Sequence, residues 1–187
     1  AIVTNIGEGD HLGLDGVDTL EKLALVKRTI VDVVLPEGTA VLNANDPLVA
    51  QMAPKCPGKV LMFALDEQHA ELAAHREAGG AVIFVRDSGI ILINDGHEIL
   101  IADLDSVPIT VNGAVKFQVE NVLAAAAAAW SMGISLSQIQ QGLLTFLPDL
   151  KHSPGRFNVL QIRGATVVVD YGHNPSALDA LIQAVEP

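Results

Sequence analysis

Segments of strand character alternate with segments of helical periodicity in the first eighty residues, and this alternation restricts the chain to few folds. Strands are predicted at residues 1–6, 39–43 and 60–65, and helices at residues 20–34, 48–53 and 71–77. In the first helix, Asp18 and Glu21 are placed as an N-terminal capping pair. Regular strand–helix alternation is typical of an α/β protein with a parallel sheet, because each crossover helix covers a face of that sheet.

The pattern changes after residue 80. Short strands are predicted at residues 81–85, 89–94, 98–103 and 107–111, separated by Asp-Ser-Gly and Asp-Gly turns. Such turns favour antiparallel hairpins, so we expect a small antiparallel meander at the edge of the sheet. Two helices, at residues 119–132 and 137–146, complete this part of the chain.

A hinge is predicted between Pro148 and Pro154, and it divides the chain into residues 1–150 and 151–187. After the hinge, residues 158–162 and 165–169 are expected to form a hairpin, and a helix is expected to begin near Ser176. This strand–loop–helix order would open a second α/β domain, of which about 30 residues are present.

Composition excludes several classes of function. Half of the residues are hydrophobic and 18% are charged, which favours a packed core over disorder. The formal net charge of −11 argues against a nucleic-acid binder and against an anionic membrane surface. The apolar run at residues 122–130 is too short to span a bilayer, and no signal peptide is visible. The single cysteine, Cys56, excludes internal disulfides and fits a cytoplasmic protein.

Lys27 occupies an unusual position for a lysine. On a helical period it lies in the middle of an apolar stripe, whose members are Leu20, Leu23, Ala24, Ile30, Val31 and Val34. A buried lysine is costly unless it is neutralised, paired or chemically modified. Two interpretations stay open: an inward-facing lysine of an active site, or a stem on apolar surface whose ammonium reaches water.

Three polar clusters follow predicted strands, where open α/β sheets bind ligands. The first is Thr4-Asn5 with Asp10-His11, a carboxylate–imidazole pair that could bind a divalent metal or belong to an ordinary loop. The second is residues 43–47, which could simply be a helix cap and turn.

The third cluster is Asp170 with His173-Asn174-Pro175. Asp170 directly follows an apolar strand and could accept hydrogen bonds from a ribose, or it could cap the next helix. Arg156, just after the hinge, could reach a phosphate or be solvated. The residues contain neither a Gly-x-x-x-x-Gly-Lys-Ser/Thr loop nor a Gly-x-Ser-x-Gly elbow.

Taken in order, these clusters resemble the Mur ligase superfamily of ATP-dependent amide-bond ligases. The matching motifs are Thr4-Asn5-Ile6 with Asp10-His11-Leu12, residues 24–30, Val41-Leu42-Asn43-Ala44-Asn45-Asp46-Pro47, residues 121–125, Pro154-Gly155-Arg156-Phe157 and Asp170-Tyr171-Gly172-His173-Asn174-Pro175. Within the superfamily, residues 5–14 with 18–23, 117–130, 154–160 and 164–178 are similar to the Mur-like half of the cyanophycin synthetases. The resemblance implies the C-terminal portion of a central ATP-binding domain, followed by the start of a Rossmann-like C-terminal domain.

The resemblance also implies a reaction and its participants. ATP would phosphorylate a carboxylate, and an amine would attack the acyl phosphate, with Mg2+ as the metal. In the cyanophycin synthetases, the Mur-like module joins L-arginine to the β-carboxylates of a poly-aspartate backbone, which another module extends with L-aspartate on a cyanophycin primer. The family further suggests a homo-oligomeric full-length protein, with no nucleic-acid or membrane partner.

Residue roles follow from the same resemblance. His11 would help to bind magnesium, and Lys27 would be carbamylated, which turns an ammonium into a carboxylate. Asn121 would approach the adenine, Arg156 the phosphates and Asp170 the ribose, while His173 lies in the same motif with a less defined role. Lys27, His11 and Arg156 are the predicted catalytic residues.

Two departures from the family pattern matter. Many Mur ligases have His-Asn where this chain has Phe117-Gln118. The phosphate loop is also missing from these residues, so we expect no turnover by this chain alone. Two other interpretations stay open: a cell-wall or folylpolyglutamate ligase, and a non-catalytic module that binds polymer or assembles oligomers. An ATP-grasp module upstream of the phosphate loop would favour the cyanophycin synthetases.

Overall fold

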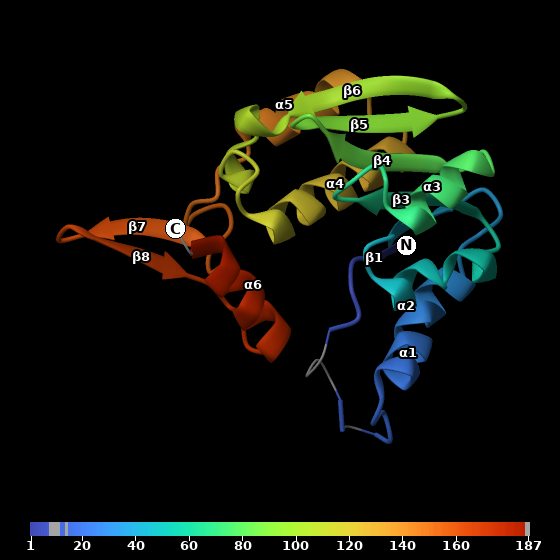
Figure 1. Ribbon diagram of the computed structural model, residues 1–187, viewed down its shortest axis with the longest axis horizontal. Coiled ribbons are helices and arrows are strands. Elements are labelled where there is room, and N and C mark those ends of the chain that lie inside the picture. Colours follow the sequence, from blue (N-terminus) through green and yellow to red (C-terminus); the bar gives the residue numbers. More distant parts are fainter. Residues whose placement is uncertain (8–11, 14, 186–187) are drawn as a thin grey trace.

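The computed structural model describes residues 1–7, 12–13 and 15–185. Its main sheet has six strands in the order β1-β2-β3-β4-β5-β6 (Figure 1). The strands are β1 (Ile2–Val3), β2 (Thr39–Asn43), β3 (Lys59–Ala64), β4 (Ala81–Arg86), β5 (Gly89–Asn94) and β6 (His97–Asp103). Strands β1 to β4 pair in parallel, and β5 and β6 add to β4 as an antiparallel meander. The predicted α/β class, with a parallel sheet and an antiparallel edge, is therefore confirmed.

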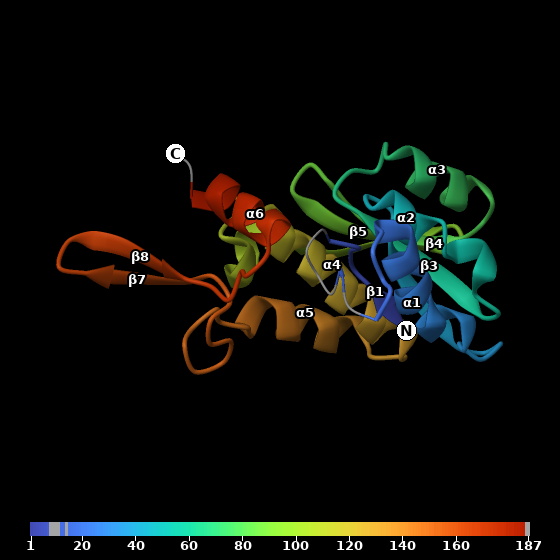
Figure 2. The same ribbon diagram turned by 90° about the horizontal axis from the view of Figure 1, so that it is seen from below.

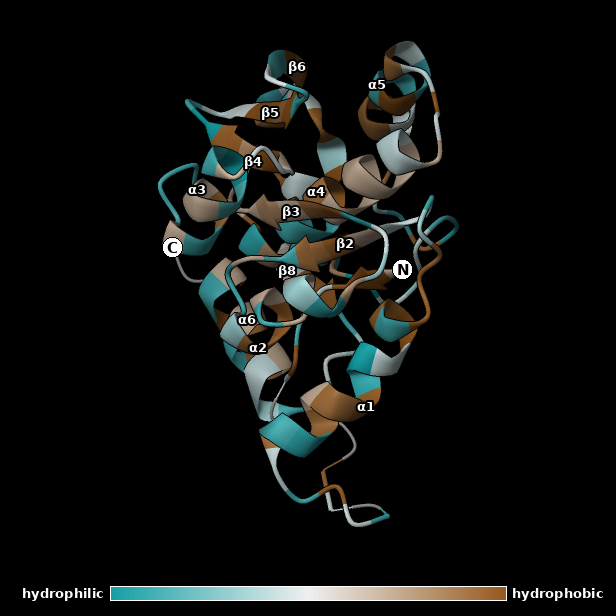
Figure 3. Ribbon diagram, turned by 90° about the vertical axis from the view of Figure 1, so that its right-hand side faces the viewer, coloured by the Kyte–Doolittle hydropathy of each residue, from teal (hydrophilic) through white to brown (hydrophobic). Residues whose placement is uncertain are grey.

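Helices cover both faces of this sheet (Figure 2). They are α1 (Leu20–Asp32), α2 (Pro47–Ala50), α3 (Ala70–Glu77), α4 (Lys116–Ser131), α5 (Leu136–Thr145) and α6 (Pro175–Val185), with 3-10 turns η1 (Ala53–Lys55), η2 (Leu104–Ser106) and η3 (Pro108–Thr110). Alternate strand residues point to opposite faces. Val41 accordingly packs toward α4, whereas the next residue, Leu42, packs toward α1. Apart from polar residues at their ends, strands β2 and β3 are hydrophobic, as expected for strands buried on both faces (Figure 3).

Helix α4 packs on the sheet, and three of its seven buried residues are alanine. Ala124, Ala126 and Ala127 are at most 5% exposed and belong to the same apolar cluster as Leu61 and Phe63 of β3. Small side chains let the helix axis approach the strands closely, and alanine is the best helix former. Helix α4 is thereby fixed relative to the parallel strands.

The expected strand at residues 107–111 is wrong. The structure has the 3-10 turns η2 and η3 there, and Val111 has a left-handed backbone with φ of 52°. Pro108 lacks the N–H that a strand ladder needs. Buried Thr110 also turns its hydroxyl onto the carbonyl oxygens of Leu104 and Val107, at 3.1 and 2.9 Å, which closes the turn locally.

Two predictions at the N-terminal end also need correction. The first strand is Ile2–Val3 rather than residues 1–6. The N-cap of α1 is Thr19, whose hydroxyl accepts the N–H of Lys22, rather than the predicted pair of Asp18 and Glu21. Asp18 instead forms an ion pair with Lys22 at 2.6 Å. Thr19 is one residue closer to the helix, so its short side chain reaches the free N–H groups of the first turn.

The C-terminal unit projects from the end of the main sheet (Figure 1). Strands β7 (Asn158–Ile162) and β8 (Ala165–Val169) form a separate antiparallel pair, followed by α6. The predicted hairpin is therefore present. The domain boundary between residues 150 and 151 stays a prediction.

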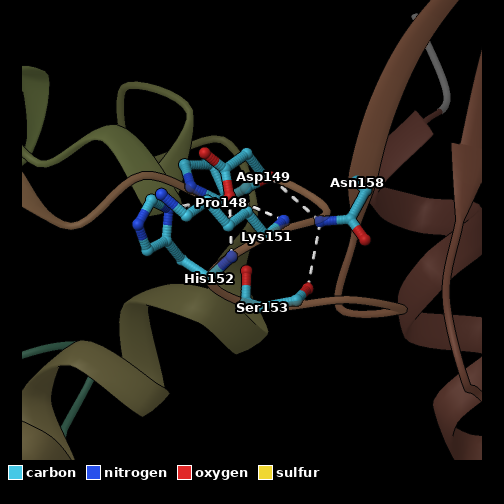
Figure 4. Close-up of polar contacts among 6 residues, drawn as sticks. All are labelled: Pro148, Asp149, Lys151, His152, Ser153 and Asn158. Atoms are coloured by element: carbon cyan, nitrogen blue, oxygen red, sulfur yellow. Dashed lines mark hydrogen bonds and ion pairs between the residues drawn. The ribbon is translucent and has the colours of Figure 1, made fainter.

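A polar network closes the loop that joins the two parts (Figure 4). Asn158 is 1% exposed, and its amide donates to the carbonyl oxygens of Pro148 and Ser153 at 3.0 and 3.1 Å. The carboxylate of Asp149 accepts from the backbone N–H and the ring Nδ1 of His152 at 2.7 and 2.8 Å. The backbone N–H of His152 lowers the pKa of the Asp149 carboxyl. The loop is thus held by its own side chains.

In the part of the chain that the structure describes, no helix combines the length and the apolar character needed to cross a membrane.

Candidate functional site

A cavity of about 640 Å3 lies between α4, the end of β1 and the C-terminal unit. All four residues that the sequence analysis assigns to a nucleotide line it, namely Asn121, Arg156, Asp170 and His173. Asn121 and His173 are 52 residues apart in the sequence, so the fold brings these residues together. Other polar and aromatic residues of the lining include Phe117, Gln118, Glu120, Tyr171 and Asn5.

The first wall is the N-terminal half of α4. Asn121 is exposed on this helix, and its Nδ2 donates to Oε1 of Gln118 at 3.1 Å. Gln118 is buried, so its side chain fixes the orientation of the Asn121 amide. The residue pair Phe117-Gln118, which departs from the family pattern, therefore lines the cavity and supports Asn121.

Arg156 forms the opposite wall. Its guanidinium lies over the ring of Tyr171, with Cζ at 5.3 Å from the ring centroid. One of its nitrogens, Nη1, donates to the carbonyl oxygen of Gly155 at 3.4 Å. The N–H groups of a guanidinium lie in its own plane. A guanidinium whose face contacts an aromatic ring therefore keeps these N–H groups available for an anion. Arg156 is exposed, so that charge can meet a ligand in the cavity.

Asp170 is engaged by the backbone through both carboxylate oxygens. Oδ2 accepts the N–H of Phe157 at 2.8 Å, and Oδ1 accepts the N–H of Gly172 at 2.6 Å. The alternative that Asp170 caps α6 is wrong, because Oδ1 of Asn174 accepts the N–H of Ala177 at 2.8 Å in that role. A carboxylate has about four acceptor positions, so Asp170 can still accept from a hydroxyl.

His173 follows on the same loop and is exposed. Its Nδ1 lies 3.2 Å from the carbonyl oxygen of Tyr171, and its ring centroid lies 5.1 Å from that of Tyr171. A carbonyl oxygen only accepts, so Nδ1 of His173 carries the hydrogen of this bond. The Tyr171 ring therefore contacts both the guanidinium of Arg156 and the ring of His173, which is tilted by 53° against it.

Lys27 is not among the described residues that line this cavity. Lys27 is half-buried on α1 and shares a helical face with buried Leu23, Ala24 and Val31. The stripe is narrower than expected, because Ile30 is 48% exposed and points away from it. His11 and Asp10 lie outside the described residues, so their predicted roles stay predictions.

The described part of the chain contains no group of three or more His, Cys, Asp or Glu side chains that could hold a metal ion. An unmodified lysine ammonium is no metal ligand, whereas a lysine carbamate supplies carboxylate oxygens of the kind that magnesium prefers. Magnesium binding through His11 and a modified Lys27 therefore stays a prediction.

Glu120 is a site residue that the sequence analysis missed. It precedes Asn121 on α4, and its Oε1 accepts from Nδ2 of Asn43 at 3.2 Å. The same Nδ2 donates to the carbonyl oxygen of Thr4 at 2.9 Å, so Asn43 joins the ends of β1 and β2 to α4. Partial burial raises the pKa of the Glu120 carboxyl, and the negative charge of Asp46 adds to that shift, whereas the bond from Asn43 opposes it.

The raised pKa of Glu120 makes stability depend on pH in a defined direction. An unfolded glutamate titrates at about 4.3. Below that pH, Glu120 is protonated in both the folded and the unfolded protein, and its contribution to the free energy of unfolding is fully present. This contribution is lost as the pH rises through the higher pKa of the folded state. Gln cannot ionise, so Glu120→Gln should gain in thermal midpoint relative to wild type as the pH rises from about 4 toward neutral.

Thermal unfolding of both proteins across this pH range measures the effect. Glu77→Gln, at an exposed position on α3, is the matched control and should follow the wild-type profile. Parallel profiles for Glu120→Gln and wild type would contradict the prediction.

A second cavity, of about 410 Å3, adjoins the first between α4 and α5. It shares Ile109, Asn121 and Phe146 with the first cavity, and its lining is otherwise almost entirely aliphatic. The Asn121 amide therefore lies at the boundary of a polar cavity and an apolar one.

The profile of the Mur ligase middle domain matches residues 1–129, which is well over half of the chain. The cyanophycin synthetase of Geminocystis herdmanii is 38% identical over 177 residues, covering 94% of this chain and 20% of that protein. The UDP-N-acetylmuramate–L-alanine ligase of Geobacter sulfurreducens is 32% identical over 191 residues, covering 98% of this chain and 36% of that protein.

A solved structure shares the fold. The crystal structure of MurF from Acinetobacter baumannii superposes with a TM-score of 0.70 at 22% identity, covering 98% of this chain and 36% of that chain. The present chain spans about a fifth of the length of the cyanophycin synthetases that it matches. The chain therefore belongs to the Mur ligase family, whose middle domain is matched by residues 1–129.

Proposed function

We propose that this chain is part of an ATP-dependent ligase of the cyanophycin synthetase type. In this proposal the Mur-like module joins the α-amino group of L-arginine to a β-carboxylate of poly-aspartate through an acyl phosphate. The observation that carries the proposal is the convergence of Asn121, Arg156, Asp170 and His173 on one cavity. Identities of 32–38% to five cyanophycin synthetases, over at least 94% of the chain, support this branch of the family.

The two adjoining cavities fit the parts of a nucleotide. The aliphatic cavity between α4 and α5 suits a flat base, and the Asn121 amide at its mouth can both donate to and accept from the edge of a base. Asp170 and Arg156 lie beyond it in the polar cavity. A base in the aliphatic cavity would leave its ribose and phosphates in the polar cavity. This arrangement supports the predicted roles of Asn121, Asp170 and Arg156.

The chemistry asked of these residues is positioning and screening of charge. Arg156 would neutralise part of the phosphate charge, so that an anionic carboxylate can approach the terminal phosphorus. The exchange forms a carboxyl–phosphate bond as the bond to ADP breaks. Attack by the neutral amine then forms the amide, releases phosphate and sheds one proton. When bound, Mg2+ would supply further charge neutralisation at the phosphates.

Ligation by the full-length parent protein tests the proposal. Labelled L-aspartate and L-arginine are supplied separately and together, with ATP and a cyanophycin primer. We expect incorporation into polymer, with both amino acids required for sustained synthesis. Incorporation of neither amino acid would defeat the assignment, and transfer to a muropeptide or folate acceptor instead would favour another Mur-type ligase.

Residues 1–187 by themselves are expected to show no ATP turnover, because they contain no Gly-x-x-x-x-Gly-Lys-Ser/Thr loop to hold the phosphates. A phosphate-release assay on the isolated chain checks this expectation. Turnover above the buffer background would contradict it.

A further inference from the structure

The turn that carries Arg156 has an unusual backbone. Gly155 has φ of 68°, which glycine adopts readily, but Phe157 also has a positive φ, of 52°. A bulky aromatic residue in this left-handed region is a genuine outlier. Such conformations are unfavourable and persist only where the surrounding structure over-determines them. The structure therefore holds Arg156 between two left-handed residues.

Hydrogen bonds hold this turn from both sides. The N–H of Phe157 donates to Asp170, and the N–H of Tyr171 donates to the carbonyl oxygen of Gly155 at 2.8 Å. The N–H of Gly155 in turn donates to Oδ1 of buried Asn158 at 2.7 Å. These hydrogen bonds consequently join the turn and the loop that follows β8 into one piece.

The ring of Phe157 connects that piece to α4. Phe157 is 5% exposed, although few side chains of the C-terminal unit are buried. Its ring meets Phe117 edge to face, with centroids 5.7 Å apart and an interplanar angle of 76°. Phe117 lies in the first turn of α4, four residues before Asn121, so the two share a helical face. The contact therefore joins the two walls of the cavity.

We infer that Phe157 is a positioning residue, which fixes the guanidinium of Arg156 relative to Asn121 by docking the strained turn on Phe117. This inference rests on the proposed function only in taking Arg156 to meet the phosphates of a nucleotide. Phe157 itself does not line the cavity, so it acts through its neighbour. The strained backbone lets two neighbouring side chains point in different directions. Arg156 faces Tyr171, whereas Phe157 packs on Phe117 of α4.

Nucleotide affinity of the full-length protein tests the inference. ATP binding is followed calorimetrically for wild type, Arg156→Ala, Phe157→Gly and the double variant, and the component that Arg156→Ala weakens is assigned to this site. Gly accepts a positive φ, so Phe157→Gly removes the ring while keeping the turn. We expect Phe157→Gly to raise the Kd of that component about five- to tenfold. The double variant should bind no more weakly than Arg156→Ala alone.

Two further variants separate positioning from general damage. Phe117→Leu leaves the turn untouched and removes its aromatic partner, so it should raise the same Kd about threefold. Val159→Ala, at an exposed position on β7 next to the turn, is the control and should bind as wild type. Wild-type affinity in both Phe variants, or a full additional loss in the double variant, would overturn the inference. So would a protein in which Arg156→Ala weakens no component of ATP binding.

Failure of the positioning role of Phe157 and failure of the proposed ligase function give different results. A parent protein that binds ATP through Arg156 and Phe157 but incorporates neither amino acid would defeat the ligase assignment and leave the positioning role intact. Normal ligation with unchanged affinity in Phe157→Gly and Phe117→Leu would do the reverse.

Discussion

Arg156→Ala in the full-length protein is expected to raise the KM for ATP in arginine incorporation by about 10- to 100-fold. A charge-assisted hydrogen bond to phosphate is worth about 1.5–3 kcal/mol, and the stacked, planar guanidinium is preorganised to make it. Arg156→Lys should recover part of the loss, because it restores the charge but neither the fork of donors nor the stacking over Tyr171. Steady-state kinetics with varied ATP measure the effect.

Arg163→Ala provides the matched control for this variant. Arg163 is also an exposed arginine of the C-terminal unit, but it lies in the turn between β7 and β8 and does not line the cavity. It should retain the wild-type KM. An unchanged KM in Arg156→Ala would return Arg156 to a solvated arginine of the hinge, the alternative that its sequence position leaves open.

Lys27→Ala should reduce ligation by the full-length protein on the order of 100-fold or more without unfolding it. The large effect is expected if Lys27 is carbamylated, because the variant would then lack an anionic ligand at a magnesium site. Folding should survive, since Lys27 is only half-buried and alanine is a good helix former. Ligation rate and thermal midpoint, measured on the same preparation, separate the two effects.

The charge of Lys27 can be tested with matched variants. Lys27→Arg keeps a cation and should fail as Lys27→Ala does, because arginine forms no carbamate and stays positively charged. Lys22→Ala, on the same helix and ion-paired with Asp18 at the surface, should ligate normally. A carbamate signal from isotope-labelled bicarbonate, absent in Lys27→Ala, would support the modification directly. Near-normal turnover in Lys27→Ala would make it an ordinary lysine whose stem lies on apolar surface.

The strand–helix part of the fold was predictable because its signals are local. The apolar runs that became β2 and β3 differ in period from the helical stripes, and burial on both faces makes them continuous. The strand expected at residues 107–111 failed because its apolar residues are equally compatible with a buried turn. The turn forms because Pro108 has no N–H to donate to a neighbouring strand and because the hydroxyl of Thr110 donates to the backbone within the turn.

For the candidate site, the sequence predicted several of the residues but not the contacts between them. Motif order pointed to Asn121, Arg156 and Asp170, whereas Glu120 carried no motif and gave no sign of its contact with Asn43, seventy-seven residues away. Tyr171 belonged to a matching motif, but the cation over its ring depends on how the turn at Gly155 is closed. Long-range polar contacts of this kind leave no periodicity in a sequence.

By itself, the sequence determined an α/β chain of the Mur ligase type and the residue types that its site needs, because these follow from periodicity and from motifs read in order. Only the tertiary structure decided that Asn121, Arg156, Asp170 and His173 line one cavity. It also decided that Asp170 braces the Arg156 turn rather than capping a helix. The physical reason is that a carboxylate binds whichever N–H groups the packed chain brings within reach, and that packing is set by Phe157 on Phe117 and by α4 on the sheet.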